Sequence, residues 1–555
     1  MKRNLLQVIL LLTMGSVFTG KFALAAHPPK PNILVILTDD MGFSDLGCYG
    51  GEIHTPNIDQ LGAQGLRYTQ FYNGARCCPT RASLLTGLYP HQAGIGHMEQ
   101  PRGKLEGYQG DLSRNALTLA EMLKTAGYGT YAVGKWHVTP FNAKLEWSRQ
   151  PVRSQDNWPL QRGFDRFYGI ISGGGSYFEP SSLARDNTRI TVQNDLEYQP
   201  KSYYFTDAIT DQAVNLLAAH HENQPGQPFF MYLAHLAPHN PLHAREEDIA
   251  RYQGKYANGY EPIRKSRFER AKQLGVIDEG WDLSSQAQDW EKVKNKAWES
   301  RCMEVYAAQV ERMDHGVGRI VTELKKQGQL ENTLILYLHD NGACAEPTGR
   351  GTATDWGGRT FNIEPGVMPG PDNTFIAYGE GWANVSNTPF RSYKHYVHEG
   401  GIATPLIAHW PARIKQQGRI VSEPGHLVDI MATCVEVSGA SYPEQYSGNK
   451  IQPMEGRSLV PSFTGEKLPD RPIGWEHEGN RAFRQGKWKL VAKGSEGAWE
   501  LYDMKNDRTE MHDLAPQNPR LVADLSAQWE SWARKTRVLP WPWGGQYGPL
   551  VKPGK

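Results

Sequence analysis

The sequence predicts an α/β protein in which a large sheet is flanked by helices. Runs of apolar and β-branched residues, the composition expected of strands buried on both faces, occur at 32–38, 130–133, 228–233, 333–338 and 406–410. Segments with helical periodicity, at 115–130 and 302–326, alternate with these runs. This alternation is typical of α/β folds. Polar or charged side chains follow several of the strands, as expected of a doubly wound sheet whose site lies along one edge.

The first residues read as a secretory signal peptide at 1–25. Lys2 and Arg3 form a positive n-region, the following run is largely apolar, and an Ala-Leu-Ala triplet at 23–25 suits cleavage. The apolar run is too short for a membrane span, and no later segment offers about 18 uninterrupted apolar residues. No cysteine precedes Cys48, so nothing there could carry a lipid anchor. We therefore expect an exported, soluble protein without a membrane anchor.

Composition excludes some classes of protein and suggests two parts to the chain. The net charge is +1 over 555 residues, with scattered lysines and arginines, which argues against a nucleic-acid-binding surface. The cysteines show no zinc-ligand spacing, standing at 48, 77, 78, 302, 344 and 434. After about residue 460 the pattern changes to short alternating strands and a final helix. We expect a large α/β domain at 26–460 and a smaller C-terminal subdomain at 461–555.

Two pairs of oxygen-bearing side chains follow buried strands. Asp39 and Asp40 come directly after the first predicted strand, and Asp340 and Asn341 come shortly after the strand at 333–338. Open α/β sheets bind their ligands at the carboxyl ends of strands. Neighbouring carboxylates need a cation to hold them together, and hard oxygen ligands favour calcium or magnesium. These four residues form a candidate metal site.

A loop that leads into a short helix is predicted at 77–87. Pro79 suits the first helical position and Gly87 suits the exit. Cys77 would then lie just before the helix N-terminus, where free amides and the helix dipole favour an anion. Arg81, one turn into the helix, can reach back toward the same point. A thiol, an arginine and a helix start together indicate a site for an oxyanion.

Further candidate residues lie near other strand ends. Lys135 and His137 are two positions apart after the strand at 130–133, so on an extended segment they point the same way. His239 stands between two prolines that stiffen its loop, which suits a positioned acid or sulfate ligand. Lys394 precedes a buried strand and is a further candidate cation.

These motifs resemble those of the type I sulfatases. The Cys-x-Pro-x-Arg pattern at 77–81, followed by Leu-Thr-Gly at 85–87, is similar to the signature of that family. Gly-Lys-Trp-His at 134–137 and the segment at 391–405 resemble further family motifs, in the family's order. The segment at 384–410 looks most like bacterial arylsulfatase-type members. One departure is His339, where the family more often has serine.

The resemblance implies a fold and a localisation. The fold would be alkaline-phosphatase-like, with a large mixed sheet flanked by helices forming the sulfatase catalytic domain at 26–460. A small C-terminal antiparallel β-sheet plus helix would form the subdomain at 461–555. The resemblance to bacterial members also implies a periplasmic or extracellular enzyme of a bacterium.

The resemblance also implies a modified residue and one calcium ion. Cys77 would be converted to Cα-formylglycine by a formylglycine-generating or anaerobic sulfatase-maturating enzyme, and its hydrate would be the nucleophile. The expected ligands of the calcium ion are Asp39, Asp40, residue 77, Asp340 and Asn341.

The remaining roles also come from the resemblance. Arg81 would hold the hydrated formylglycine, and Lys135 would supply positive charge beside the sulfate. Asp340 would accept the proton of the nucleophile. His137 would assist breakdown of the sulfated intermediate, and His239 with Lys394 would protonate the leaving alcohol.

Two other functions stay open beside hydrolysis of an aryl or carbohydrate sulfate. One is a phosphate or phosphonate monoester hydrolase of the same superfamily, since phosphate and sulfate are close in shape. The other is a catalytically inactive, calcium-dependent protein that binds sulfated glycans. The sequence leaves the identity of the sulfate ester, its ring position and exo or endo action open.

Overall fold

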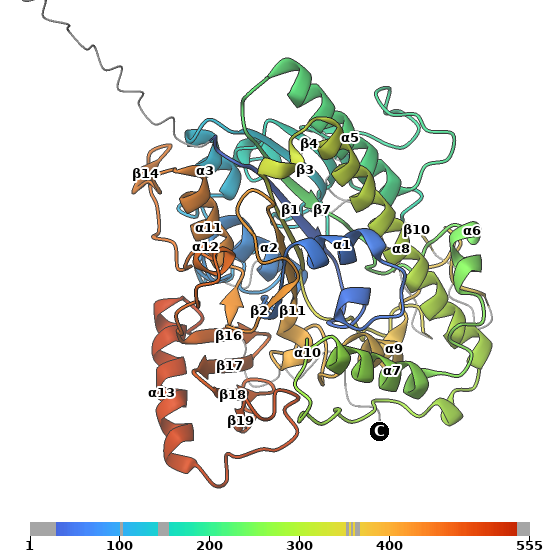
Figure 1. Ribbon diagram of the computed structural model, residues 1–555, viewed down its shortest axis with the longest axis vertical. Helices are drawn as coiled ribbons and strands as arrows, with labels where there is room; N and C mark the ends of the chain where they lie inside the picture. Colours follow the sequence, from blue (N-terminus) through green and yellow to red (C-terminus); the bar gives the residue numbers. More distant parts are fainter. Residues whose placement is uncertain are drawn as a thin grey trace, which may run out of the picture.

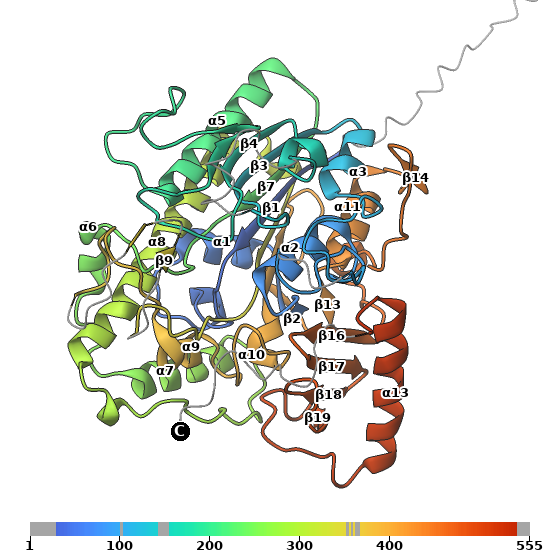
Figure 2. The same cartoon turned by 180° about the vertical axis from the view of Figure 1, so that it is seen from behind.

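The computed structural model describes residues 29–99, 104–141, 155–350, 355–356, 359–360 and 367–540. The predicted signal peptide at 1–25 lies outside these residues. Within them the chain forms a large mixed sheet with helices on both faces and a smaller antiparallel sheet with its own helix (Figures 1 and 2).

The large sheet has 11 strands. Their bounds are β1 (Asn32–Thr38), β2 (Leu66–Tyr72), β3 (Gly129–Lys135), β4 (Arg166–Ile170), β5 (Leu183–Arg185), β6 (Thr188–Arg189), β7 (Phe229–Ala234), β8 (Thr333–His339), β11 (Ala403–His409), β12 (Arg419–Val421) and β13 (Gly425–His426). Their order is β12-β2-β11-β8-β1-β7-β3-β4-β5-β6, and β13 pairs with β2.

The strand directions bring distant parts of the chain to one edge of this sheet. β1 runs parallel to β8, with Thr38 beside His339, and parallel to β7, with Leu37 beside Ala234. β3 is parallel to β7, whereas β11 is antiparallel to both β8 and β2. The carboxyl ends of β1, β2, β3, β7 and β8 therefore meet the amino end of β11 at a single edge. The predicted α/β class is confirmed, and the sheet is mixed.

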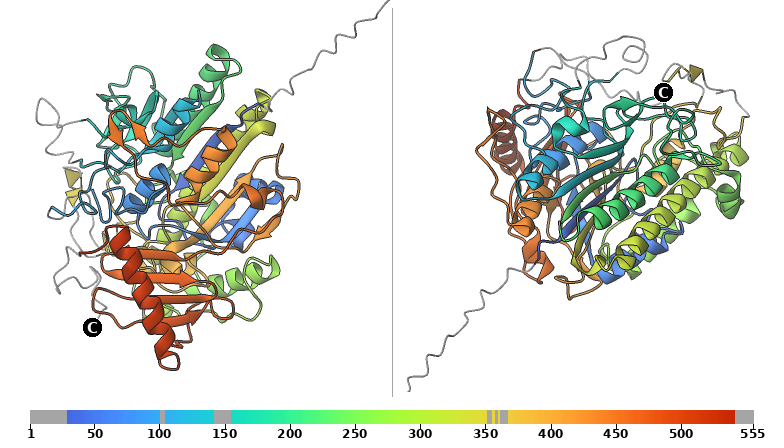
Figure 3. Two further views of the ribbon diagram at one scale, coloured as in Figure 1. Left: turned by 90° about the vertical axis from the view of Figure 1, so that its left-hand side faces the viewer. Right: turned by 90° about the horizontal axis from the view of Figure 1, so that it is seen from above.

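Helices cover the two faces of the sheet in two layers (Figure 3). The first layer contains α1 (Pro56–Gln64), α5 (Phe205–Asn223) and α8 (Lys296–Lys326). The second contains α2 (Cys77–Thr86), α3 (Leu119–Thr125), α11 (Asp429–Ser438) and α12 (Val460–Phe463). Successive residues of β1 point into opposite cores, Ile36 into the first and Val35 into the second. Burial on both faces explains why these strands are continuously apolar.

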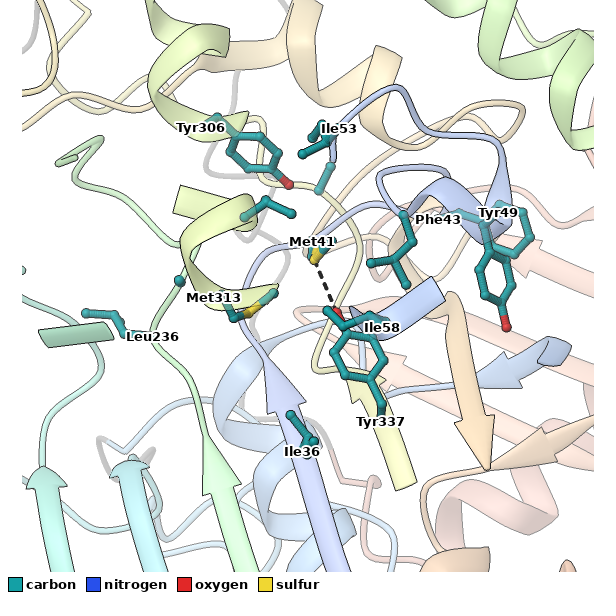
Figure 4. Packing of buried hydrophobic residues seen from close by; sticks show 14 of the residues in the cluster. Ile36, Met41, Phe43, Tyr49, Ile53, Ile58, Leu236, Tyr306, Met313 and Tyr337 are labelled. Atoms are coloured by element: carbon teal, nitrogen blue, oxygen red, sulfur yellow. Dashed lines mark hydrogen bonds between the residues drawn. The ribbon is translucent and has the colours of Figure 1, made fainter. Parts of the chain in front are cut away.

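The first core also anchors the segment that follows β1. Met41 lies among apolar side chains from α1, α8 and β8, including Ile58 and Met313 (Figure 4). The hydroxyl of Tyr337 donates to the sulfur of Met41 at 3.5 Å. Packing of Met41 fixes the chain just beyond Asp39 and Asp40, the residues at the strand's carboxyl end.

Two predicted helices differ from the observed ones in length. The helix predicted at 115–130 is the shorter α3, because Thr118 and Glu121 form a reciprocal capping box that sets its start. The helix predicted at 302–326 begins earlier, at Lys296, after the Asn295 side chain caps it by accepting from the Trp298 amide.

The remaining short elements lie in the connections. The helices are α6 (Glu246–Ile249), α7 (Tyr260–Gln273), α9 (Gly379–Ser386), α10 (Glu399–Ile402), and the 3₁₀ turns η1 (Gly47–Tyr49), η2 (Pro159–Arg162), η3 (Ala250–Tyr252), η4 (Trp290–Lys292) and η5 (Leu330–Asn332). The strands are β9 (Asp355–Trp356), β10 (Arg359–Thr360), β14 (Gln445–Tyr446) and β15 (Asn449–Lys450). Among the described residues, no helix is both long and apolar enough to cross a membrane.

The smaller sheet is built from consecutive antiparallel strands near the end of the chain. They are β16 (Ile473–His477), β17 (Asn480–Gln485), β18 (Trp488–Ala492) and β19 (Glu500–Asp503), followed by α13 (Pro519–Lys535). One face of this sheet packs on α13 through Phe483 and Trp529. The other face joins the first core through Trp475 and Tyr502. An antiparallel sheet with a helix was expected here, within 461–555.

Buried charges connect the smaller sheet to the large one. Glu399, in α10 just before β11, accepts hydrogen bonds from Lys489 at 2.8 Å and from Arg508 at 2.7 Å. Lys489 also lies 2.8 Å from Glu510, and all four side chains are fully buried. Because charges so deeply buried must be compensated, these contacts hold the two sheets in one arrangement.

Removal of one member of this network is expected to destabilise the protein strongly. Lys489→Met should lower the free energy of unfolding by about 3 kcal/mol or more, because Glu510 then keeps a buried charge without its Lys489 partner and Glu399 keeps only Arg508 of its two cations. Lys487→Met is the matched control, since Lys487 lies two residues away and its pair with Asp503 is half exposed. That change should cost less than about 1 kcal/mol. Urea denaturation followed by tryptophan fluorescence measures both, and equal losses would contradict the role given to the buried network.

Candidate functional site

All the site residues predicted from the sequence come together at the edge where the strand ends meet. Each is placed by a strand end or by the connection beside it. They are Asp39 and Asp40 after β1, Cys77 and Arg81 in α2 after β2, Lys135 at the end of β3 with His137 beyond it, His239 after β7, Asp340 and Asn341 after β8, and Lys394 before β11.

Oxygen atoms gather where β1 and β8 end side by side. Asp39, Asp40, Asp340 and Asn341 are all buried. The Asp40 amide donates to Asp340 Oδ1 at 3.3 Å, and Asn341 Nδ2 donates to Asp40 Oδ1 at 2.7 Å. The Oδ1 atoms of Asp39 and Asn341 are buried and make no hydrogen bond within the described residues. Because buried oxygens are normally satisfied, these two atoms suit the ligands of a hard cation.

The pKa shifts of Asp39 and Asp340 also indicate a cation site. Burial and the adjacent charge of Asp39 raise the pKa of Asp340 well above its usual range, although Arg81 opposes this. Burial also acts to raise the pKa of Asp39, but the positive charges of Lys135, His239 and Arg81 outweigh it and lower that pKa. A divalent cation among these oxygens would remove the repulsion between the carboxylates.

Three cationic side chains surround the oxygen cluster. Arg81 Nη2 donates to Asp39 Oδ2 at 3.1 Å and to Asp340 Oδ2 at 2.8 Å. Lys135 Nζ lies 2.5 Å from the same oxygen of Asp39. Lys394 Nζ donates to Asp40 Oδ2 at 3.0 Å. The site therefore holds fixed positive charges on both sides of the carboxylates, as binding of an anionic group requires.

The helix that carries Cys77 begins earlier than the sequence predicted. α2 starts at Cys77 itself, with Arg76 as its N-cap, and Pro79 is the third helical residue rather than the first. Proline fits there because amides in the first turn have no intrahelical acceptor. Cys77 thus lies at the positive end of the helix. A hydrogen bond from Cys78 holds the pKa of its thiol well below the usual range, against the effect of burial, and Lys135 and His137 add to this.

His137 lies beside Cys77 with a carboxylate partner that the sequence did not indicate. Its Nε2 lies 3.1 Å from Glu99 Oε2, which also accepts from Cys78 Sγ at 3.3 Å. Burial lowers the pKa of His137, but Cys77 and Glu99 outweigh it and raise the pKa. Gly173 leaves room for the ring, since a Cβ there would lie 2.2 Å from His137 Nε2. His137 has a φ of 56°, so the predicted extended alternation with Lys135 does not hold, yet both side chains lie near Cys77.

His239 approaches the cluster from the β7 side. Its Nε2 lies 3.5 Å from Asp40 Oδ2, and its Nδ1 lies 2.6 Å from the Asn240 carbonyl oxygen. Burial lowers the pKa of His239, despite the nearby carboxylates of Asp40 and Asp39. Because Nδ1–H donates to the Asn240 carbonyl, Nε2 is the ring nitrogen that faces the site and can exchange a proton there.

Two glutamates near the site were not among the predicted site residues. Glu99 lies between predicted elements and belongs to no motif. Glu478, in the turn between β16 and β17, contacts Arg76 and His395, the neighbours of Cys77 and Lys394. Glu478 belongs to the Glu-His-Glu triplet at 476–478, for which the sequence favours a structural role but also allows a place in the pocket lining. Only the long-range contacts of the fold distinguish these residues from ordinary surface acids.

Comparison with protein families identifies the chain's relatives. A family model described as Sulfatase matches residues 31–440. A second model, described as N-sulphoglucosamine sulphohydrolase, C-terminal, matches residues 391–535. The first match covers most of the chain, including all of the site residues predicted from the sequence.

Individual relatives and solved structures agree with the family match. An uncharacterized sulfatase of Schizosaccharomyces pombe is 32% identical over 93% of this chain and 96% of its own length. An arylsulfatase of Klebsiella aerogenes is 33% identical over 78% of this chain and 92% of its own length. The crystal structure of Ps i-CgsB in complex with k-i-k-neocarrahexaose aligns with a TM-score of 0.65 and 25% identity, covering 91% of this chain and 93% of that one. The chain therefore belongs to the type I sulfatases, has their alkaline-phosphatase-like fold, and is a sulfuric ester hydrolase.

Proposed function

We propose that the chain hydrolyses sulfate monoesters of aryl or carbohydrate alcohols with a Cα-formylglycine at position 77 and one calcium ion. The observation that carries this proposal is the position of Cys77. Cys77 starts α2, and Arg81 and Lys135 both donate to the nearby carboxylate of Asp39.

The oxygen cluster suits calcium better than a softer metal. Asp39, Asp40, Asp340 and Asn341 offer carboxylate and amide oxygens, the ligands that calcium prefers. Two of these oxygens, in Asp39 and Asn341, have no hydrogen-bond donor among the described residues. A calcium ion bound there would add positive charge beside residue 77 and orient an oxygen of the sulfate group.

Hydrolysis begins with the negative charge of the ester. A sulfate monoester repels nucleophiles, so the site must first compensate its charge. Arg81, Lys135 and Lys394 provide fixed cationic groups at positions set by their contacts with Asp39 and Asp40. A hydrated formylglycine supplies two hydroxyls on one carbon, one to attack sulfur and one whose deprotonation expels sulfate and restores the aldehyde.

Proton transfers are assigned to the side chains around residue 77. Asp340, whose charge interacts with that of Cys77, accepts the proton of the attacking hydroxyl. His137 lies next to residue 77 and, oriented by Glu99, removes the proton that releases sulfate. His239 and Lys394 both contact Asp40 and together protonate the leaving alcohol.

The names of the relatives support a proposal about the substrate class. The Klebsiella relative bears the name arylsulfatase, and Ps i-CgsB was solved in complex with k-i-k-neocarrahexaose. We propose aryl or carbohydrate sulfates as substrates, export directed by the segment at 1–25, and conversion of Cys77 by a separate maturation enzyme. Assay of sulfated monosaccharides by ring position, beside an aryl sulfate and an aryl phosphate, identifies the substrate.

Modification of Cys77 is testable by mass. Trypsin cleaves after Arg76 and Arg81, so residue 77 lies in the pentapeptide 77–81. In active protein this peptide should be lighter by about 18 Da than the cysteine form, the change expected when the thiol becomes an aldehyde that serves in covalent catalysis. Active protein whose peptide carries only the thiol would exclude the proposed nucleophile.

Loss of Cys77 should abolish turnover without loss of the fold. We expect Cys77→Ala to lower kcat on 4-nitrophenyl sulfate by about 10³-fold or more, as removal of a covalent nucleophile does. Cys434→Ala is the matched control, because Cys434 is an equally buried free cysteine in α11, within the second core. Its kcat should stay within about threefold of wild type, since it removes packing but no reacting group. Substantial turnover by Cys77→Ala would refute the mechanism.

Calcium should both stabilise the protein and support activity. Chelator-treated protein should lose turnover and melt at a lower temperature, and calcium at about 100 times its Kd should restore about 2.7 kcal/mol of stability. Asn341→Ala should weaken calcium binding by about tenfold or more in calorimetric titration, since it removes an oxygen ligand. Gln309→Ala, a change of a buried amide in α8, should leave calcium affinity unchanged. Equal calcium affinity in the Asn341 variant would show that the ion binds elsewhere.

A further inference from the structure

Glu478 lies at the tip of the β-hairpin that points from the smaller sheet toward the catalytic edge. His477 pairs with Asn480, so Glu478 and Gly479 form a two-residue turn. Their φ angles, 53° and 80°, are those of a turn whose first position favours asparagine, aspartate or glycine. A glutamate is therefore an unfavourable choice for the turn itself, and the contacts of its side chain must account for it.

Those contacts run to the sequence neighbours of two reacting residues. Arg76 Nη1 donates to Glu478 Oε1 at 2.7 Å, and His395 Nδ1 lies 2.8 Å from Glu478 Oε2. Arg76 is the N-cap of α2, directly before Cys77. His395 directly follows Lys394. One carboxylate thus holds the residues next to the nucleophile position and next to the cation assigned to the leaving group.

The backbone supports the same connection. The His395 amide donates to the Ala75 carbonyl oxygen at 2.9 Å, and Asn480 Nδ2 donates to the His395 carbonyl oxygen at 3.0 Å. Ala75 and His395 have φ angles of 64° and 81°. Non-glycine residues keep such conformations only where surrounding contacts hold them. The hairpin therefore contacts the ring of His395 through Glu478 and its backbone carbonyl through Asn480.

A metal ion is a poor explanation for this cluster. Ligand atoms of His395, His477 and Glu478 do lie within 4.8 Å of one another. However, Arg76 Nη1 already lies 2.7 Å from Glu478 and 2.8 Å from His395 Nδ1. A dication placed beside that guanidinium would be strongly repelled. Burial acts to raise the pKa of Glu478, but His477, His395 and His97 outweigh it and hold that pKa well below its usual range.

We propose that Glu478 is a positioning residue by which the smaller sheet completes the active site, holding residue 77 and Lys394 at their working separation. This inference rests on the proposed function, because it assigns Lys394 to the leaving alcohol. Loss of the Glu478 carboxylate leaves Arg76 and His395 with Glu346 alone as a carboxylate partner, at 3.6 Å and 2.9 Å. Lys394 then shifts relative to the ester. The step that suffers most is protonation of the leaving group, because donation depends steeply on geometry.

The test uses aryl sulfates whose leaving phenols differ in acidity. 4-Nitrophenol departs readily without a proton, whereas phenol depends on one. We expect Glu478→Ala to lose about tenfold more kcat/KM on phenyl sulfate than on 4-nitrophenyl sulfate, since a positioned general acid contributes about 10²–10⁴-fold. Glu478→Gln keeps an oxygen acceptor for Arg76 but loses the charge. The extra loss of kcat/KM on phenyl sulfate should therefore lie between that of wild type and that of Glu478→Ala. Rates are normalised to the fraction of residue 77 that is converted.

Glu476→Gln is the matched control. Glu476 lies two residues away on the same hairpin, is buried, and bonds to His91 at 2.7 Å rather than to Arg76 or His395. Glutamine keeps the oxygen that accepts from the Gly479 amide, so the turn is preserved. Any loss of kcat/KM in this variant should be the same on both substrates.

The outcomes separate the inference from the proposed function. If Glu478→Ala and Glu478→Gln lose kcat/KM by the same factor on both substrates, or retain wild-type rates, the positioning role is overturned while the sulfatase mechanism stands. If the alanine variant does not fold, the glutamine variant alone decides by the same criterion. Unmodified Cys77 in active wild-type protein would overturn the proposed function, and this inference with it.

Discussion

The structure depends on the concentration of negative charge where β1 and β8 end side by side. Parallel pairing places Thr38 beside His339, and this register forces Asp39 and Asp340 into the same buried space. Arg81 bridges the two carboxylates, and Lys135 binds Asp39. Without these cations the two strands could not end together in the interior, because uncompensated buried charges are too costly.

The same charges prepare the site for a sulfate ester. Arg81 reaches the carboxylates from α2, whose first residue is Cys77. The contact that stabilises the fold therefore also sets the position of residue 77 relative to the oxygen cluster. In the proposed mechanism, the side chains that compensate the buried carboxylates also compensate the charge of the anionic substrate.

Much of this arrangement could be predicted from the sequence. Continuously apolar strands indicated a sheet buried on both faces, and polar residues such as Asp39 and Asn341 at strand ends indicated the edge where ligands bind. β11 runs antiparallel to its neighbours, so Lys394, which precedes this strand, lies at the same edge. No local sequence feature indicates the direction of β11. The start of α2 at Cys77 was missed because Pro79 is compatible with either of two first-turn positions.

Long-range contacts explain the two glutamates near the site that were not predicted as site residues. Glu99 and Glu478 act through partners about 40 to 400 positions away, His137 and Arg76, whose proximity only the fold creates. The smaller sheet likewise looks like an appendage in the sequence. In the structure one of its faces belongs to the first core, and its buried Lys489 pairs with Glu399 just before β11.

A crystal structure of the matured protein, with calcium identified by anomalous scattering, tests the central claim most directly. The account predicts a single calcium peak about 2.3–2.6 Å from oxygens of Asp39, Asp40, Asp340 and Asn341, and density for a hydrated aldehyde at residue 77 facing it. A calcium peak away from these oxygens, or an unmodified thiol at residue 77 in an active crystal, would contradict it.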